Sequence, residues 1–172
     1  MTAKDLAQSI DHTLLKATAT DQQIKELCME ALEHQFASVC VPPYYLSIVN
    51  NYLKEDPLVK SCTVIGFPLG YDETTTKLFA LQQAIQAGAE ELDVVINVAA
   101  IKNASWEYIE NELNLMVKLT RQSGKLLKII FETCYLDDHE IIRLAKLCAD
   151  TGVDYVKTST GFGFTKNEQG FY

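Results

Sequence analysis

Leu126-Leu-Lys-Ile-Ile-Phe131 is a nearly continuous apolar run, and so is Asp93-Val-Val-Ile-Asn97 earlier in the chain. A strand with one face in water alternates apolar and polar residues, whereas an unbroken apolar run suits a strand covered on both faces. Amphipathic helical patterns separate such runs and no hairpin signal joins them, so we expect parallel pairing through crossover helices. The sequence therefore predicts one α/β domain.

The same order of a short apolar run, turn residues and an amphipathic stretch recurs along the chain. The predicted strands are Ser9–Leu14, Ala37–Val41, Ser61–Phe67, Glu91–Val98, Leu126–Thr133 and Asp154–Ser159. The predicted helices are Asp21–His34, Tyr44–Glu55, Thr74–Ala87, Trp106–Gln122 and Asp138–Thr151. Residues that can cap a helix, such as Thr20 and Asp137, precede these segments, and Gly152 follows one of them.

Six such strands fit either a doubly wound open sheet or part of a (β/α)₈ barrel. The first strand–helix turn carries no G-x-G-x-x-G motif, and G-x-x-x-x-G-K-[ST] is absent from the sequence, so the nucleotide-binding forms of the open sheet lack support. Polar residues recur within the strands or at their ends, namely Asp11, Thr13, Cys40, Asp93, Asn97, Lys128, Glu132 and Lys157. In a barrel these positions converge on the axis and one face, whereas in an open sheet they spread along an edge.

Composition limits the classes of partner. The 172 residues carry a formal net charge of −8 and no Lys/Arg-rich run, which argues against nucleic acid as the main partner. No apolar run reaches the length of a membrane helix and the N-terminus lacks a signal-peptide pattern, so we expect a cytoplasmic protein without membrane association. The five cysteines are widely spaced and form no C-x-x-C pair, so no metal site is expected.

Lys157 ends the run Val153-Asp-Tyr-Val-Lys157, at the carboxyl end of a predicted buried strand. An ammonium group there loses hydration, which lowers its pKa. The neutral amine is a nucleophile that can attack a carbonyl group and form a Schiff base. The alternative is that Lys157 reaches water or forms a structural ion pair, as most lysines do.

Asp93 and Lys128 fall inside apolar strands, where an unpaired charge is strongly unfavourable. Each needs a partner, and each is the natural partner of the other if the fourth and fifth strands are neighbours. Strand parity places Lys128 on the same face as Glu132, and Asp93 on the same face as Asn97. A carboxylate held between Lys128 and Lys157 could move protons to and from a reacting carbon or hydroxyl group. The alternative is a buried salt-bridge network without catalysis.

The segment Thr158-Ser-Thr-Gly-Phe-Gly163 directly follows Lys157. Hydroxyl groups, backbone N–H groups and glycines that permit close approach are suited to phosphate oxygens. The same composition is also typical of an ordinary loop. Next to a candidate Schiff-base lysine, it favours a small phosphorylated ligand.

Successive motifs resemble those of bacterial deoxyribose-phosphate aldolases. They are Ile10-Asp-His-Thr-Leu-Leu-Lys16, Ser38-Val-Cys-Val41, Cys62-Thr-Val-Ile-Gly-Phe-Pro-Leu-Gly70, Glu91-Leu-Asp-Val-Val-Ile-Asn97, Leu127-Lys-Ile-Ile-Phe-Glu-Thr133 and Val156-Lys-Thr-Ser-Thr-Gly-Phe162. The resemblance implies a TIM barrel and a metal-free, cofactor-free class I aldolase of deoxyribonucleotide catabolism. Such an enzyme reversibly cleaves 2-deoxyribose 5-phosphate to glyceraldehyde 3-phosphate and acetaldehyde.

The resemblance also implies a role for each motif residue. Lys157 would form the Schiff base, Asp93 would be the acid/base carboxylate acting through a bound water, and Lys128 would support its charge. The residues implied on the substrate side are Asp11, Thr13, Cys40, Thr160 and Gly161. Cys40 could equally be a core thiol.

Members of that family continue through a seventh strand with a second lysine and an eighth with phosphate-binding Gly and Ser residues. We therefore expect residues 1–172 to form a single aldolase-type βα domain with about six of the eight βα units, lacking the strand 7 and strand 8 region. An incomplete barrel has two unpaired edges, which favours a homo-oligomer. Two alternatives to an active aldolase remain open: an inactive fragment that persists as an oligomer or interaction module, and a doubly wound phosphate-binding domain.

Overall fold

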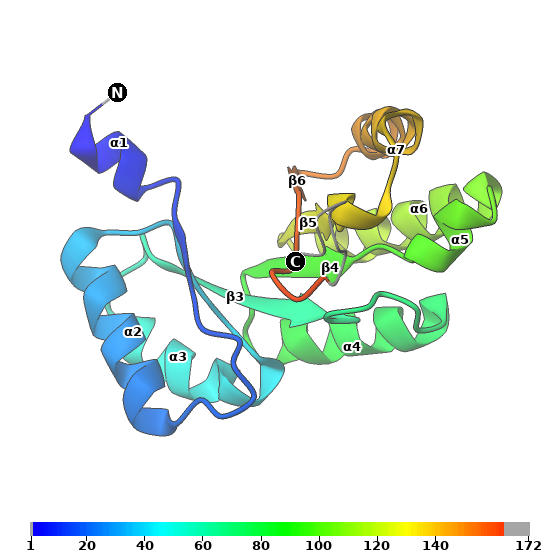
Figure 1. Ribbon diagram of the computed structural model, residues 1–172. Helices are drawn as coiled ribbons and strands as arrows, with labels where there is room; N and C mark the ends of the chain where they lie inside the picture. The colour runs from blue at the N-terminus through cyan, green and yellow to red at the C-terminus, as the bar shows by residue number, and fades with distance from the viewer. Residues whose placement is uncertain (1, 164–172) are drawn as a thin grey trace. The chain divides into compact units, whose positions relative to one another are not determined.

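Helices and strands alternate along the computed structural model, which describes residues 2–163 (Figure 1). The strands are β1 (Asp11–Thr13), β2 (Ser38–Val41), β3 (Lys60–Ile65), β4 (Glu91–Val95), β5 (Leu126–Ile130) and β6 (Tyr155–Lys157). The α-helices are α1 (Ala3–Ala7), α2 (Asp21–His34), α3 (Leu46–Leu53), α4 (Thr74–Gln86), α5 (Val98–Lys102), α6 (Trp106–Gln122) and α7 (Asp138–Thr151). Short 3₁₀ turns, η1 (Pro43–Tyr45) and η2 (Thr133–Tyr135), follow β2 and β5.

The six strands form one sheet in chain order, from β1 to β6. The pairs β1–β2, β2–β3 and β5–β6 are parallel. A doubly wound sheet reverses its strand order at a switch point, whereas a barrel adds each strand beside the one before it. The unreversed order therefore confirms a partial barrel with six strands and excludes the doubly wound alternative for this chain.

The predicted strands and helices are all present, and the differences lie at their ends. The fourth strand stops at Val95 because Asn97 caps α5, its side chain accepting a hydrogen bond from the Ala100 amide at 3.1 Å. The helix α5 is only five residues long and was not predicted, and the same holds for α1. The fifth strand stops at Ile130, before the predicted end at Thr133.

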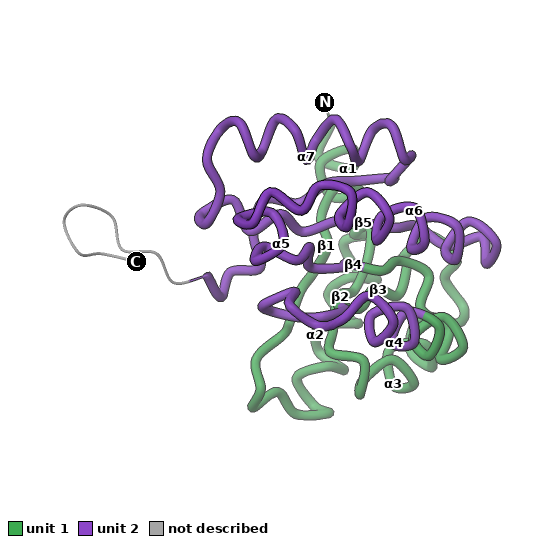
Figure 2. Tube along the Cα trace, turned by 90° about the vertical axis from the view of Figure 1, so that its right-hand side faces the viewer, with its two compact units in different colours: residues 1–64, 82–92 green, residues 65–81, 93–172 purple. Residues whose placement is uncertain are grey.

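The chain divides into two compact units, drawn in different colours in Figure 2. The first comprises residues 1–64 and 82–92. Its core is formed where α2 packs on α3 and on the buried strand β2. The residues at its centre include Ile24, Cys28, Val39, Val41 and Val49, all fully buried.

The second unit comprises residues 65–81 and 93–172. The helix α6 packs on α7 and β5, and its apolar face buries Ile109, Leu113 and Met116. A capping box begins α7, because Asp137 accepts a hydrogen bond from the Glu140 amide and the Glu140 carboxylate accepts one from the Asp137 amide. This packing holds β5 and β6, which carry Lys128 and Lys157.

Within residues 2–163, the helices are all too short or too polar to cross a membrane.

Candidate active site

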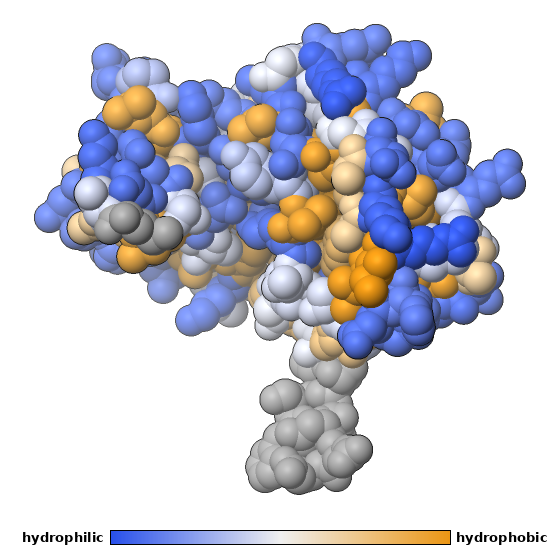
Figure 3. Space-filling view, turned by 90° about the horizontal axis from the view of Figure 1, so that it is seen from above, coloured by the Kyte–Doolittle hydropathy of each residue, from blue (hydrophilic) through white to orange (hydrophobic). Residues whose placement is uncertain are grey.

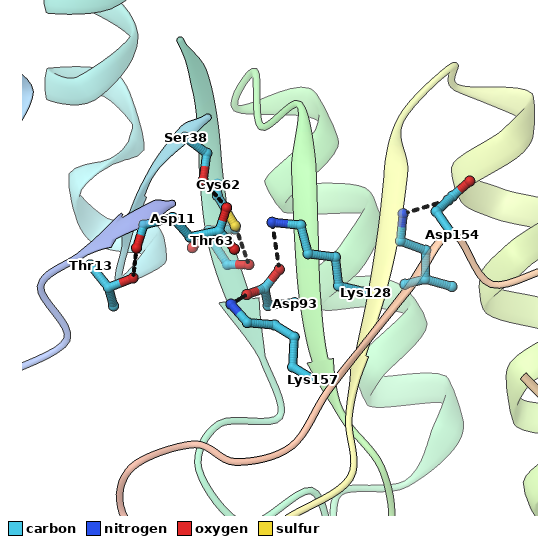
Figure 4. A network of polar contacts seen from close by, with 10 residues as sticks. Asp11, Thr13, Ser38, Cys62, Thr63, Asp93, Lys128, Asp154 and Lys157 are labelled. Atoms are coloured by element: carbon cyan, nitrogen blue, oxygen red, sulfur yellow. Dashed lines mark hydrogen bonds and ion pairs between the residues drawn. The ribbon is translucent and has the colours of Figure 1, made fainter. Parts of the chain in front are cut away.

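In the second unit, one carboxylate lies between two lysines (Figure 4). Lys157 Nζ is 2.5 Å from Asp93 Oδ2, and Lys128 Nζ is 3.6 Å from Asp93 Oδ1. The two amines therefore contact different oxygens of the same group. The sequence predicted the contact between Asp93 and Lys128 from neighbouring strands, and a carboxylate between two lysines was the hypothesis built on it.

Strand register explains why the two lysines share one carboxylate. In the parallel β5–β6 pair, Lys128 is opposite Tyr155 and Ile130 is opposite Lys157. Because side chains two residues apart point to the same face, Lys128 and Lys157 lie on one face of the sheet, about 7 Å apart along the strands. That stagger leaves room for the Asp93 carboxylate between the two amines.

The three side chains differ in their access to water. The exposed fraction is 1% for Asp93 and 6% for Lys128, but 30% for Lys157. Asp93 and Lys128 thus form the buried part of the site, and Lys157 is the amine that a solute can reach. An accessible amine hydrogen-bonded to a buried carboxylate has the parts needed for nucleophilic attack with proton transfer.

The loop after β6 is tied to the end of β5. Glu132 is 2% exposed, and its carboxylate accepts hydrogen bonds from the Thr160 amide, 3.2 Å from each oxygen, and from the Thr160 hydroxyl. Strand parity does not extend to Glu132 as predicted, because β5 ends at Ile130 and the φ of Glu132 is left-handed, at 54°. Gly161 follows Thr160 with a φ of 81°. Both donors of Thr160 therefore point to Glu132.

The remaining predicted site residues belong to the first unit. The Ser38 hydroxyl donates to Asp11 Oδ1 at 2.7 Å, and the Thr13 hydroxyl donates to the Asp11 carbonyl oxygen at 2.8 Å (Figure 4). Cys40 is a buried free thiol in β2. These contacts fix the Asp11 and Thr13 side chains locally.

A second buried ion pair in the second unit was not predicted. Lys77 Nζ is 3.3 Å from Glu112 Oε2 and also donates to the Val95 carbonyl oxygen at 3.0 Å, and both side chains are fully buried. The Thr74 hydroxyl donates to the other Glu112 oxygen at 3.1 Å. Burial lowers the pKa of Lys77 and raises the pKa of Glu112, because each charged form loses hydration.

The positions of Lys77 and Glu112 within their helices could have predicted this ion pair. Lys77 has the same helical phase as the buried residues Leu81 and Ala84, and Glu112 lies between Ile109 and Met116 on the apolar face of α6. A charge on an apolar stripe predicts a buried ion pair. The pair ties α4 and α6 to the end of β4, two residues beyond Asp93.

Comparison with protein families and curated proteins gives a consistent result. Residues 6–171 match the family model described as DeoC/LacD family aldolase. A deoxyribose-phosphate aldolase of Caldicellulosiruptor saccharolyticus is 47% identical over 163 residues, which cover 94% of this chain and 74% of the relative. One from Exiguobacterium sp. is 49% identical over 158 residues, which cover 92% of this chain and 71% of the relative.

Comparison with solved structures agrees with the match to the family model. A Coccidioides immitis protein described as a candidate deoxyribose-phosphate aldolase matches with a TM-score of 0.90 and 38% identity, over 98% of this chain and 65% of that one. A deoxyribose phosphate aldolase from Aeropyrum pernix, described as tetrameric, matches with a TM-score of 0.85 and 35% identity, over 96% and 68%. The chain thus spans about two thirds of the length of these two structures.

Proposed function

We propose that this chain, which belongs to the DeoC/LacD family of aldolases, is a lyase that reversibly cleaves 2-deoxy-D-ribose 5-phosphate to D-glyceraldehyde 3-phosphate and acetaldehyde. The observation that carries the proposal is the contact of 2.5 Å between the Lys157 amine and the buried Asp93 carboxylate. A partly exposed amine can receive a substrate aldehyde, and a buried carboxylate beside it can handle the protons that the reaction moves.

The first step is attack by Lys157. Its neutral amine adds to the C1 aldehyde of the open-chain sugar, forming a carbinolamine with a new N–C bond. Loss of the C1 hydroxyl group as water gives a protonated Schiff base. Asp93 can take the proton that the amine releases and return one to the departing hydroxyl group, through a bound water where its oxygens do not reach directly. The resulting iminium ion is the electron sink for the next step.

Carbon–carbon cleavage follows. Removal of the proton from the C3 hydroxyl group lets its electrons form the aldehyde of glyceraldehyde 3-phosphate while the C2–C3 bond breaks. The electron pair of that bond moves to the iminium and gives an enamine on Lys157. Protonation at C2 and addition of water then release acetaldehyde and restore the amine. Asp93 serves as the acid/base group, and Lys128, 3.6 Å from its other oxygen, balances the carboxylate charge.

The substrate-side assignments remain part of the proposal. Asp11, Thr13 and Cys40 are assigned to the sugar, and Thr160 and Gly161 to the phosphate side. The donors of Thr160 are engaged by Glu132, which favours a role for Thr160 in shaping the loop and leaves phosphate contact to the neighbouring backbone. The chemistry requires no metal or cofactor, because the lysine iminium accepts the electrons.

Borohydride trapping tests the proposal. Acetaldehyde and borohydride should leave an ethyl group on Lys157, located by peptide mass mapping, and the sugar phosphate should also give a reduced adduct there. The matched variant is Lys157→Arg, which keeps a cation beside Asp93 but cannot form a Schiff base. We expect it to be folded, untrapped and inactive in the retro-aldol assay. Equal turnover by Lys157→Ala and the wild type would refute the mechanism.

We also propose a cytoplasmic homo-oligomer. The strand β6 exposes Tyr155 and Val156 by 57% and 52%, and apolar side chains interrupt the polar surface in Figure 3. Apolar side chains exposed to water favour association with another copy. The tetrameric Aeropyrum pernix relative supports this assignment, and the five free cysteines suit a reducing compartment. Size-exclusion chromatography with light scattering would measure the assembly.

A further inference from the structure

Glu132 is a buried acid that the proposed reaction does not use. It lies two residues beyond the end of β5, and it is 2% exposed. Its φ of 54° and ψ of 62° lie in the left-handed region, which is uncommon for a residue with a side chain. Such a conformation persists only where the surroundings determine it, and it is found preferentially at functional sites.

Glu132 and its two neighbours contact the segment that follows Lys157, and the Cys134 thiol also donates to Glu132 Oε1 at 3.9 Å. The Phe131 amide donates to the Lys157 carbonyl oxygen at 3.0 Å, and the Thr133 amide donates to the Thr158 carbonyl oxygen at 2.8 Å. Between these two backbone bonds, the Glu132 carboxylate accepts the amide and hydroxyl protons of Thr160. The chain is therefore held before and after the turn that leaves β6.

The left-handed turn is what aims the carboxylate at this segment. If β5 continued past Ile130 with regular alternation, Glu132 would lie on the face of Lys128. The positive φ breaks that alternation and places the carboxylate against Thr160. Close packing completes the contact, because a Cβ atom on Gly163 would lie 3.1 Å from Glu132 Cδ and 2.6 Å from Cys134 Sγ.

We infer that Glu132 is a positioning residue for Lys157: by holding Thr160 it fixes the 158–163 loop and keeps the Lys157 amine at Asp93. The inference rests on the proposed Schiff-base function. Glu132 itself touches neither reacting atoms nor substrate in this role. Its effect is transmitted along the backbone from Thr160 to Lys157. Loss of the contact between Glu132 and Thr160 therefore lets the amine leave its 2.5 Å contact with Asp93.

Acetaldehyde trapping is the suitable measurement, because acetaldehyde carries no phosphate and reports only on the Lys157 amine. Glu132→Ala should slow borohydride trapping on Lys157, per folded molecule, by about tenfold to a hundredfold, the effect expected when a reacting group is misplaced by about 1 Å. Glu132→Gln should restore most of the rate, because its amide oxygen can still accept from Thr160. Thr160→Val removes the hydroxyl donor and should slow trapping to a smaller degree.

The possible outcomes separate the explanations. A lower melting temperature with unchanged trapping in Glu132→Ala would mean that Glu132 only stabilises the fold, and would overturn the inference. A raised KM for the sugar phosphate with unchanged acetaldehyde trapping would mean a phosphate-side role, and would overturn it too. If Glu132→Ala does not fold, Thr160→Val tests the inference instead. Trapping at the wild-type rate in that variant would refute a positioning role for the contact between Glu132 and Thr160. Absence of trapping in the wild type itself refutes the proposed function as well.

Discussion

Lys128 Nζ lies 3.6 Å from Asp93 Oδ1, on the opposite carboxylate oxygen from Lys157. In the proposed reaction, Asp93 therefore keeps a cationic partner when Lys157 loses its proton to become the nucleophile. Without Lys128, the buried carboxylate would have no cation beside it at that stage of the proposed reaction, which is unfavourable for a buried charge. In the proposed mechanism, Lys128 therefore stabilises Asp93 and takes no part in covalent chemistry.

Lys128→Met tests that assignment. A charge-assisted contact contributes about 1.5–3 kcal/mol, so its loss should lower kcat by about tenfold to a hundredfold. Trapping of acetaldehyde on Lys157 should persist, because the nucleophile remains. Lys118→Met, a change at an exposed position on α6, is the control and should leave kcat unchanged. A Lys128→Met protein with normal kcat would remove Lys128 from the mechanism.

Asp93→Asn should abolish most turnover. The amide keeps the size of the side chain but cannot take up the proton, and loss of a general acid/base lowers kcat by about 10²–10⁴-fold. It also removes the carboxylate charge beside the buried Lys128, which should reduce the free energy of unfolding by up to about 3–5 kcal/mol. Retro-aldol kinetics and urea unfolding measure the two effects. Asp150→Asn, at an exposed position on α7, should change neither.

The buried pair Lys77–Glu112 predicts a non-additive effect on stability. Lys77→Met leaves the Glu112 carboxylate buried without its cation, which should lower the free energy of unfolding by about 3–5 kcal/mol. The double variant Lys77→Met with Glu112→Gln removes both charges and should recover most of that loss. Urea unfolding of the two single variants, the double variant and the wild type measures the coupling. Additive losses would mean that the two side chains do not interact.

The same pair predicts a pH dependence. Burial raises the pKa of Glu112, so the folded state holds this proton more tightly than the unfolded state does. The contribution of Glu112 to stability is therefore greatest at low pH and falls as the pH rises from about 4.3, the ordinary value for Glu, through the raised pKa. Glu112→Gln lacks this fall, so the stability advantage of the wild type over the variant should narrow across that range. If the stability advantage of the wild type over Glu112→Gln grew as the pH rose, the pKa of Glu112 would not be raised by folding.

The sequence predicts the cluster of Asp93, Lys128 and Lys157 better than the residues around it, because strand periodicity is strict. Asp93, Lys128 and Lys157 are charges in apolar strands that follow one another in the sheet, so parity and neighbourhood bring them together. Strand parity and the order of neighbouring strands can both be predicted from the sequence. The fold class was predictable for the same reason, since buried parallel strands read as unbroken apolar runs.

The Lys77–Glu112 pair and the orientation of Glu132 were not predicted, because each departs from the usual pattern of its helix or strand. Lys77 and Glu112 lie on helices, where a charge ordinarily faces water, and only their phase with buried neighbours marks them. Glu132 follows an apolar strand, and parity placed it beside Lys128. Its left-handed φ redirects the side chain to Thr160, and no residue pattern indicates a positive φ at a glutamate.

Comparing alanine variants of Gly70 and Gly124 tests whether the close packing of Gly70 against the Ile96 backbone supports the site. Both have a left-handed φ, 69° and 63°, so an alanine at either position meets a similar backbone penalty of about 1–2 kcal/mol. A Cβ atom at Gly70 would lie 2.1 Å from the Ile96 carbonyl oxygen, whereas one at Gly124 would have nothing within 4 Å. Ile96 immediately follows β4, so displacing it disturbs the end of the strand that carries Asp93.

We therefore expect Gly124→Ala to lower the free energy of unfolding by about 1–2 kcal/mol and to leave kcat unchanged. Gly70→Ala should lower it further, because backbone must move to relieve the overlap with Ile96, and it should also reduce kcat by shifting Asp93 relative to the two amines. Urea unfolding and retro-aldol kinetics on both variants separate the contributions, since the φ penalty is common to them. Equal losses of stability in the two variants would mean that the chain around Gly70 can yield without strain, and that its contact with Ile96 does not support the site.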